Sequence, residues 1–326
     1  MLEAYKLKEI SNNESIQFNG KDFLQLSDFS SDEILYLLNE AQELKDLQKQ
    51  GKPHPFLSGK VLGMIFEKSS TRTRVSFEVG MLQLGGHAIF LSSKDLQLGR
   101  GESISDTGKV LSRYVDGIMI RTFSHESVEE LAENASIPVI NGLTDLQHPC
   151  QVLADLLTIL EHKGKLAGLK MCYLGDGNNN MAHSLMEGAI KVGMDISIAC
   201  PLGYLPDGKV TEKAIKAGKL TGSTVMLTNS PQEAVKDADV IVTDVWTSMG
   251  QEEEAAIRVK TFKDYQVNEE LCKHAKSDFI FLHCLPAHRG EEVTAEIIDG
   301  PHSVVFDEAE NRLHAQKAIL KLLLAK

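Results

Sequence analysis

The feature that most constrains this chain is a regular alternation of short apolar runs with helical patterns. In the first half, apolar runs of strand length are separated by segments in which apolar residues recur at helical spacing. The expected strands are 60–66, 87–92, 117–121 and 137–141, and the expected helices are 31–50, 71–84, 103–115 and 124–134. Strands that alternate with helices form right-handed βαβ units and a parallel sheet. The first half is therefore predicted to be an α/β domain.

The alternation restarts after a helix expected at Gln151–His162. The further expected strands are 169–174, 195–200, 223–228, 239–246, 278–284 and a short last strand at 303–306. A chain of 326 residues exceeds the size at which one hydrophobic core usually stops growing. We therefore predict an α/β protein of two doubly wound parallel-sheet domains, with the active site in the cleft between them. The domains are expected at 1–150 and 151–307, and the amphipathic helix 308–326 is expected to pack on the first.

Composition excludes several classes of function. The net charge is −12 and no basic run is present, so we expect neither nucleic acid nor an anionic membrane as a partner. The first residues, Met1–Glu14, are polar and of mixed charge, and the longest apolar runs are strand-sized, which favours a cytoplasmic protein. Five scattered cysteines argue against a disulfide framework or a structural zinc cluster and are expected to be free thiols.

A candidate anion site follows the strand expected at Val61–Phe66. Hydroxyl side chains and backbone N–H groups at a helix start bind anions, and Arg72 can grip phosphate oxygens through paired donors. Alternatively, Ser70 only caps the helix and Arg72 and Arg74 point into solvent. However, arginines in a first turn oppose the helix dipole unless an anion compensates. We therefore favour a phosphate or carboxylate site, on which Arg121, at the end of another expected strand, could converge.

Three motifs carry a resemblance to a known family. Ser70-Thr71-Arg72-Thr73-Arg74 resembles the carbamoyl phosphate signature shared by the aspartate and ornithine carbamoyltransferases. His148-Pro149-Cys150-Gln151 is similar to the family's His-Pro-x-Gln element, and His283-Cys284-Leu285-Pro286 resembles the element of the ornithine branch. Recognisable motifs run in the family's order from about residue 60 to 315, which makes a chance match very improbable.

The resemblance implies a set of carbamoyl phosphate ligands. It gives the phosphate to Ser70, Thr71, Arg72 and Thr73, with Arg121 bridging toward the carbonyl side. It gives the carbamoyl group to His148, Gln151 and the backbone carbonyls of Cys284 and Leu285. The implied ligands are Ser70, Thr71, Arg72, Thr73, Gln97, Arg121, His148, Gln151, Cys284, Leu285 and Arg312. Cys150 replaces a threonine common in the family, and we expect the activity to survive that change.

Gln97 matches a family loop that reaches into a neighbouring subunit's site, which implies a homo-oligomer, usually a trimer. On the residues alone, the Gly-rich stretch around Gln97 favours a surface loop, because Gly and Ser are typical of turns. In the same way, His148 could be a structural histidine beside a turn-forming proline.

The acceptor side is expected after two strands of the second half. Gly175–Asn180 follows an apolar run, but its glycine pattern is wrong for a dinucleotide fingerprint. Consecutive asparagines suit the polar end of a zwitterionic amino acid, although turn formation explains them too. The resemblance selects Asn179 as the ornithine contact. It likewise selects Asp244, otherwise a possible turn former, for the α-ammonium group.

Ser248 and Met249 would complete this ornithine pocket, in a loop 244–251 expected to act as a lid. The thiol of Cys284 fits either a covalent nucleophile or a polar positioning group, and the resemblance favours positioning.

Together these features predict transfer of a carbamoyl group from carbamoyl phosphate to the side-chain amine of L-ornithine. The expected catalytic residues are Arg72, Arg121, His148 and Cys284. No metal or cofactor is expected, because the sequence has no HExxH, P-loop or clustered Cys/His spacing. The alternatives are a carbamoyltransferase for another amine, such as putrescine or N-acetylornithine, and a binding module without turnover.

Overall fold

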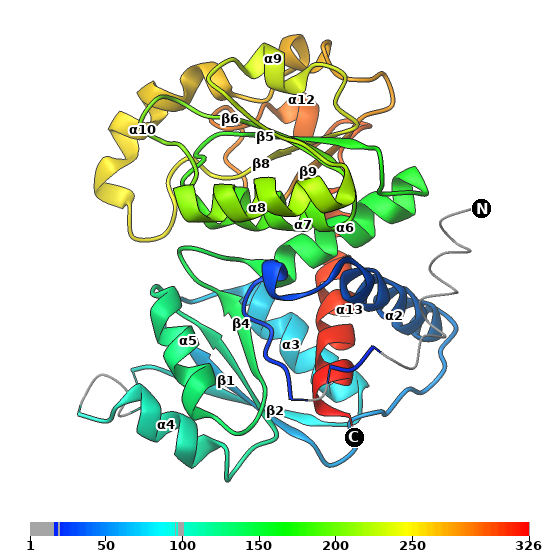
Figure 1. Cartoon of the computed structure of the whole chain (residues 1–326), viewed down its shortest axis with the longest axis vertical. Helices are drawn as coiled ribbons and strands as arrows, with labels where there is room; N and C mark the ends of the chain where they lie inside the picture. The colour runs from blue at the N-terminus through cyan, green and yellow to red at the C-terminus, as the bar shows by residue number, and fades with distance from the viewer. Residues whose placement is uncertain (1–15, 19, 95, 97–100, 326) are drawn as a thin grey trace. The chain divides into compact units, whose positions relative to one another are not determined.

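The computed structural model describes residues 16–325 except 19, 95, 97–100 and the side chain of Glu252. The chain divides into two compact units. The first unit runs to Leu157 and resumes at Glu310, and the second unit is Thr158–Ala309. Each contains one parallel sheet flanked by helices (Figure 1), so the predicted pair of parallel α/β domains is confirmed.

The first unit has a four-stranded sheet in the order β2-β1-β3-β4, with all pairings parallel. Its strands are β1 (Val61–Phe66), β2 (His87–Ser92), β3 (Gly117–Arg121) and β4 (Val139–Leu143). Its helices are η1 (Leu26–Asp28), α2 (Ser31–Lys49), α3 (Thr71–Gln83), α4 (Ile104–Leu111), α5 (His125–Asn134), the start of α6 (Pro149–Lys163) and most of α13 (Val305–Leu324).

Serine caps start four of these helices, because a serine oxygen satisfies an N–H group that the helix itself leaves without a partner. The capping residues are Ser30, Ser70, Ser103 and Ser124, and Ser30 forms a full capping box with Glu33. Apolar residues of α4 and α5 pack on one face of the sheet in a cluster with β3 and β4.

Helices α13 and α2 run side by side in the first unit (Figure 1), where Lys45 Nζ donates to Asn311 Oδ1 at 2.7 Å. Helix α13 also packs on α3 at Gly80. A Cβ atom at Gly80 would lie 3.3 Å from the side chain of Lys317, so glycine allows this close approach.

The second unit has a five-stranded parallel sheet in the order β7-β6-β5-β8-β9. Its strands are β5 (Lys170–Leu174), β6 (Asp195–Ala199), β7 (Val225–Thr228), β8 (Val240–Thr243) and β9 (Ile280–His283). Its helices are α7 (Asn180–Lys191), α8 (Gly208–Thr221), α9 (Pro231–Val235), η2 (Glu252–Glu254), α10 (Ala255–Phe262), η3 (Lys263–Tyr265), α11 (Glu269–Cys272) and α12 (Ala295–Ile298).

The core of the second unit explains why each of its central strands is a continuous apolar run in the sequence. Residues of α9, α11 and α12 form one buried cluster with β5, β8 and β9, and α7 and α8 lie on the opposite side of the sheet (Figure 1). A parallel sheet covered on both faces buries both faces of its strands, which therefore read as continuous apolar runs. The strands β8 and β9 are buried at every position.

The structure corrects one expected strand. At 303–306, only Ser303 forms a bridge, with Phe281, and helix α13 already begins at Val305. Acids in its first turn, Asp307 and Glu308, favour this early start because they complement the helix dipole. Within the described ranges, no helix combines the length and apolar character needed to cross a membrane.

Candidate active site

The amino terminus of α3 carries several of the residues expected to bind an anion. Ser70 caps the helix by accepting from the Thr73 N–H group at 3.2 Å, Thr71 is exposed in the first turn and Arg72 is half-buried. The first turn of α3 contains no acid, so no side chain of its own offsets the positive end of the helix dipole. Phe66, the last residue of β1, pairs with Arg121, which ends β3, and this register brings Arg121 to the same sheet edge.

His148 lies among the arginines of this edge. Burial, and then the guanidinium groups of Arg312, Arg121 and Arg72, hold the pKa of His148 well below its usual range. The imidazole is therefore neutral at physiological pH and able to donate to a carbonyl oxygen without carrying charge. The same interactions show that the structure brings together four of the residues expected to bind carbamoyl phosphate.

Arg312 is fixed by two other expected ligands. Its guanidinium donates to Gln151 Oε1 at 2.5 Å and to Thr73 Oγ1 at 3.2 Å. Gln151 in turn donates from Nε2 to Asp155 Oδ1 at 2.8 Å. Arg312, Gln151 and Thr73 are buried, so this network is rigid and its charge is weakly screened. Cys150 lies next to it in the sequence; its thiol contacts the Asn141 carbonyl oxygen, and burial raises its pKa to about 12.

Arg74 does not belong to this group. Its guanidinium donates to Glu78 Oε1 at 3.0 Å and stacks on the Phe90 ring. The argument that both arginines of the first turn need an external anion is therefore wrong for Arg74, because Glu78 one turn later compensates it. The sequence analysis also missed Lys68, which is buried, forms an ion pair with Asp145 and lies 4.3 Å from the centre of the Phe123 ring.

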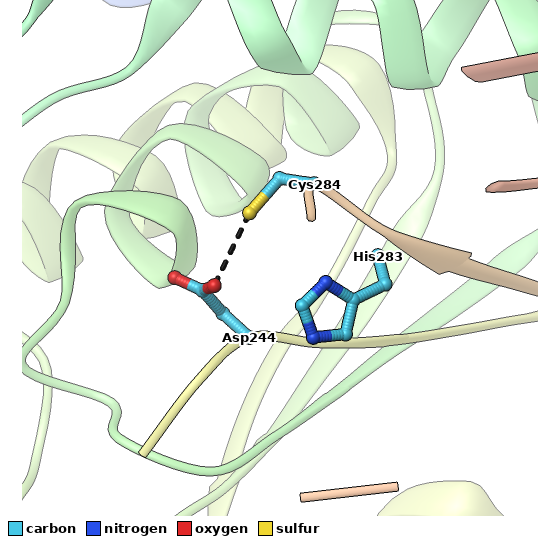
Figure 2. A group of neighbouring side chains, drawn as sticks. All are labelled: Asp244, His283 and Cys284. Atoms are coloured by element: carbon cyan, nitrogen blue, oxygen red, sulfur yellow. Dashed lines mark hydrogen bonds between the residues drawn. The ribbon is translucent and has the colours of Figure 1, made fainter. Parts of the chain in front are cut away.

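In the second unit, Asp244 is the centre of a hydrogen-bonded group at the carboxyl ends of β8 and β9. Asn179 Nδ2 donates to Asp244 Oδ2 at 3.3 Å, and the Cys284 thiol donates to Oδ1 at 3.1 Å (Figure 2). The Val245 N–H group also donates to Oδ1, at 2.8 Å. Asp244 is buried and does not merely terminate the strand. Because the Cys284 thiol hydrogen is directed at a carboxylate, this arrangement supports a positioning role over a nucleophilic one.

Asn179 serves two purposes, because its Oδ1 accepts from the Met181 N–H group at 2.6 Å and caps α7. Ser248 and Met249 lie on the loop after β8, where the Ser248 N–H group donates to Gln251 Oε1 at 3.1 Å. Met249 is 47% exposed, so its side chain is available to a ligand.

Sequence reasoning missed the residue that anchors this loop. Arg258 of α10 is buried, forms an ion pair with Asp176 and donates to the backbone carbonyl oxygen of Trp246. It therefore connects the Gly175–Asn180 segment to the loop that bears Ser248. No signal in the sequence distinguishes Arg258 from a solvent-exposed helical arginine, because its partners are distant along the chain.

Asp244, His283 and Cys284 place their potential ligand atoms within 4.8 Å of one another (Figure 2), which is close enough for a metal ion. Both ring nitrogens of His283 already contact other groups, however, at Leu285 and Glu292. Metal binding would have to break these hydrogen bonds as well as the Cys284–Asp244 contact. Among the expected ligands, Gln97 lies outside the described residues.

Taken together, an arginine-lined anion site on one parallel α/β unit and a carboxylate-centred site on another are typical of a transferase with an anionic donor and an amine acceptor. Comparison with protein families narrows this class. The family model "Aspartate/ornithine carbamoyltransferase, carbamoyl-P binding domain" matches residues 21–161, and the model for the Asp/Orn binding domain matches residues 167–323. The chain belongs to the aspartate/ornithine carbamoyltransferase family.

Individual relatives fall within the ornithine branch. The ornithine carbamoyltransferase of Carboxydothermus hydrogenoformans is 65% identical over 307 residues, covering 94% of this chain and 98% of that protein. The Bacillus subtilis ornithine carbamoyltransferase is 65% identical over 311 residues, covering 94% and 95%. Among solved structures, ornithine carbamoyltransferase from Pyrococcus furiosus superimposes with a TM-score of 0.92 at 57% identity, covering 95% of this chain and 98% of that chain.

Proposed function

We infer that this chain is an enzyme that transfers the carbamoyl group of carbamoyl phosphate to the side-chain amine of L-ornithine, giving L-citrulline and phosphate, in arginine metabolism. The identity of 65% to ornithine carbamoyltransferases over nearly the whole chain carries this conclusion. The first unit supplies the carbamoyl-phosphate-binding domain of the family and the second its amino-acid-binding domain.

For the donor, we propose that Ser70, Thr71 and Thr73 bind the phosphate together with Arg72. Arg121 and His148 would then stabilise the charge that builds on the carbonyl oxygen in the transition state. The neutral state of His148, caused by burial and by the arginines around it, supports its role as a hydrogen-bond donor. Gln151 and Arg312 are proposed to bind the donor from positions that their own hydrogen bonds fix.

For the acceptor, we propose that the Asp244 carboxylate binds the α-ammonium group of ornithine, beside Asn179. Ser248 and Met249 would complete the pocket, and the backbone carbonyls of Cys284 and Leu285 would hold the carbamoyl NH2 group. The burial of the Asp244 carboxylate supports this assignment, because a buried carboxylate favours a cationic partner. Putrescine differs from ornithine by lacking the α-carboxylate.

The proposed reaction needs no group that the two substrates and these residues do not supply. The side-chain amine, with a free pKa of about 10.4 by analogy with lysine, must first lose a proton, and desolvation favours its neutral form. After the first proton has gone to solvent, its nitrogen forms a bond to the carbonyl carbon, the bond from that carbon to the phosphate oxygen breaks, and the leaving phosphate accepts the second proton that the nitrogen loses. Much of the acceleration would come from holding the two substrates in register.

We also propose a homo-oligomer, a trimer or a multiple of trimers. Strand β2 lies at the edge of its sheet, and large apolar side chains on β2 and α3 are exposed: Val75, Leu82, Ile89 and Phe90. An exposed apolar sheet edge favours association with another copy. The mass in solution, measured by analytical ultracentrifugation, tests this proposal. The cytoplasmic location expected from composition stays a prediction.

The decisive test of function is citrulline formation from carbamoyl phosphate by the purified protein. Ornithine, putrescine, N-acetylornithine and aspartate are offered separately as acceptors. Turnover only with ornithine supports the assignment, and turnover with another amine would refute the acceptor pocket but keep the chemistry. No turnover with any acceptor would favour the binding module.

A further inference from the structure

The segment that follows β9 has a backbone conformation that needs support. Leu285 has φ of 55°, in the left-handed region that a branched side chain rarely adopts. Such a conformation is unfavourable and persists only where its surroundings hold it. Leu285 is also the residue whose carbonyl is proposed to hold the carbamoyl NH2 group.

Two buried side chains hold this segment. The Leu285 N–H group donates to His283 Nδ1 at 2.9 Å, and His283 Nε2 lies 3.1 Å from Glu292 Oε1. The same Glu292 oxygen accepts from the His288 N–H group at 2.6 Å. Glu292 therefore links the backbone at His288 to the His283 ring, and the His283 ring in turn binds the backbone at Leu285.

These contacts determine the tautomer of His283. Because Nδ1 accepts the Leu285 N–H group, it carries no hydrogen, so the hydrogen of the neutral ring is on Nε2 and is donated to Glu292. A carboxylate on the far nitrogen is a usual way to fix the tautomer and orientation of a functional histidine. In this segment the other ring nitrogen, Nδ1, accepts from the Leu285 backbone N–H group.

Burial makes the arrangement rigid. The side chains of His283 and Glu292 are each 0% exposed. The backbone N–H group of His283 donates to Glu308 Oε2 at 2.8 Å. Hydrogen bonds in such surroundings are strong, and a buried carboxylate without partners would be costly. Glu292 follows Glu291 in a charged stretch that is typical of a protein surface. Only the structure shows that Glu292, unlike Glu291, is fully buried.

We propose that Glu292 and His283 are a pair of positioning residues that hold the Leu285 backbone in place for the carbamoyl group. The inference rests on the proposed function. Although His283 lies beside Asp244 and Cys284 (Figure 2), its ring nitrogens are both occupied within its own segment. It acts on the reaction through Leu285, because a misplacement of about 1 Å at a reacting group costs about 10²-fold in rate.

Two matched pairs of variants test this. In His283→Asn, the amide oxygen can replace Nδ1 as acceptor, whereas in His283→Gln the amide group extends toward Glu292 instead. Glu292→Gln keeps the accepting Oε1, and Glu292→Ala loses it. We expect kcat at saturating substrates to fall about 10- to 100-fold in His283→Gln and Glu292→Ala, and less than about threefold in the other two variants.

Hydrogen exchange of the peptide that spans residues 283–290 gives a readout that does not depend on turnover. Exchange should accelerate at least about tenfold in the two impaired variants only, because the Leu285 and His288 N–H groups lose their acceptors. Melting temperatures verify that all four variants are folded at the assay temperature.

The proposal is overturned if the two members of each pair lose kcat equally, since that pattern reports general damage to packing, or if no variant loses kcat. If the unaltered protein forms no citrulline, the proposed function fails instead. The exchange data then still decide whether Glu292 and His283 hold the segment.

Discussion

The candidate sites of the two units carry opposite charges and are built by different means. In the first unit, the buried cations Arg121 and Arg312 surround a neutral histidine at a helix start. In the second unit, one buried carboxylate, Asp244, collects donors from Asn179 and Cys284. This contrast matches the two proposed substrates, since carbamoyl phosphate is an anion and the recognised end of ornithine carries an ammonium group.

The units also differ in how their sites are supported. In the first unit, residues proposed to bind the carbamoyl donor are joined by direct side-chain hydrogen bonds. The chain of contacts runs from Thr73 through Arg312 and Gln151 to Asp155. The acceptor residues lie on loops after strands, where Asn179 and Cys284 donate to Asp244, and the Gly175–Asn180 segment and the loop after β8 are connected further by Arg258 of helix α10. We therefore expect damage to the arginine site of the first unit to lower turnover, and damage to the Asp244 site or its anchor Arg258 to weaken ornithine binding selectively.

The largest effect is expected for Arg72→Ala, which removes a charge from the anion site. Loss of an arginine that stabilises a phosphoryl-type transition state typically costs about 10³-fold or more in kcat. Citrulline formation under saturating substrates measures it. Arg74→Ala is the matched control, because Arg74 pairs with Glu78 on the surface, and its kcat should change less than about threefold. Equal losses in both variants would contradict the separation of their roles.

Asp244→Asn should raise the KM for ornithine about 100-fold, because a buried charge-assisted interaction is lost. The KM for carbamoyl phosphate should stay within a few-fold, and initial rates at varied concentrations of each substrate distinguish the two. Asp239→Asn, at the start of the same strand, removes a carboxylate paired with Lys276 and should leave both KM values unchanged. A comparable rise in both KM values after Asp244→Asn would argue against the division of labour.

Arg258→Lys should raise the KM for ornithine about tenfold, because one ammonium group cannot replace a planar fork that serves both the Asp176 carboxylate and the Trp246 carbonyl. The carbamoyl phosphate KM serves as the internal reference. Arg289→Lys is the control, since Arg289 pairs with Asp299 at the surface of the same unit. If Arg258→Lys left the ornithine KM unchanged, the anchoring of the loop would be refuted.

The smallest effect concerns stability in acid and belongs to the first unit. Burial, and then nearby cations including Lys317, Lys45 and Lys49, lower the pKa of His314 from 6.5 to about 3. As the pH falls below 6.5, the unfolded chain takes up this proton before the folded chain does. The free energy of unfolding therefore falls with a slope of about 1.4 kcal/mol per pH unit from this residue, down to about pH 3.

His314→Gln should remove that part of the slope in urea unfolding curves measured between pH 6.5 and 4. His288→Gln, which alters a half-exposed histidine of the second unit, should leave the slope as it is. If the His314 variant had the same slope as the unaltered protein, the excess of buried cations in the first unit would not govern its acid stability.

Much of the fold could be predicted because it depends on local patterns. The apolar runs 60–66, 87–92 and 195–200 correspond to strands to within a residue, and the serines before α2 and α3 mark where these helices begin. The run at 239–246 extended the strand too far, because buried apolar residues of a loop, such as Trp246, have the same composition as a strand. The strand expected at 303–306 was wrong for a related reason, because the apolar residue Val305 belongs to a helix.

The individual site residues could be named from motifs, but their surroundings could not. The Arg74–Glu78 pair has the (i, i+4) spacing that a helix brings together and could have been predicted, but nothing in the sequence predicts that Arg72 lies near His148. Nor does the sequence distinguish the buried carboxylate of Glu292 from the neighbouring Glu291. Such differences arise from residues far apart in the chain, and their energies depend on burial.

By itself, the sequence determined that this chain forms parallel α/β units and that it carries an arginine site and an acidic site at strand ends, because strand–helix periodicity and residue chemistry are local properties. Only the tertiary structure decided which cations are buried, that His148 is neutral, and that Arg258 pairs with Asp176 and His283 with Glu292. Desolvation and long-range hydrogen bonds exist only once distant segments pack together, and they set the charge and rigidity of these groups.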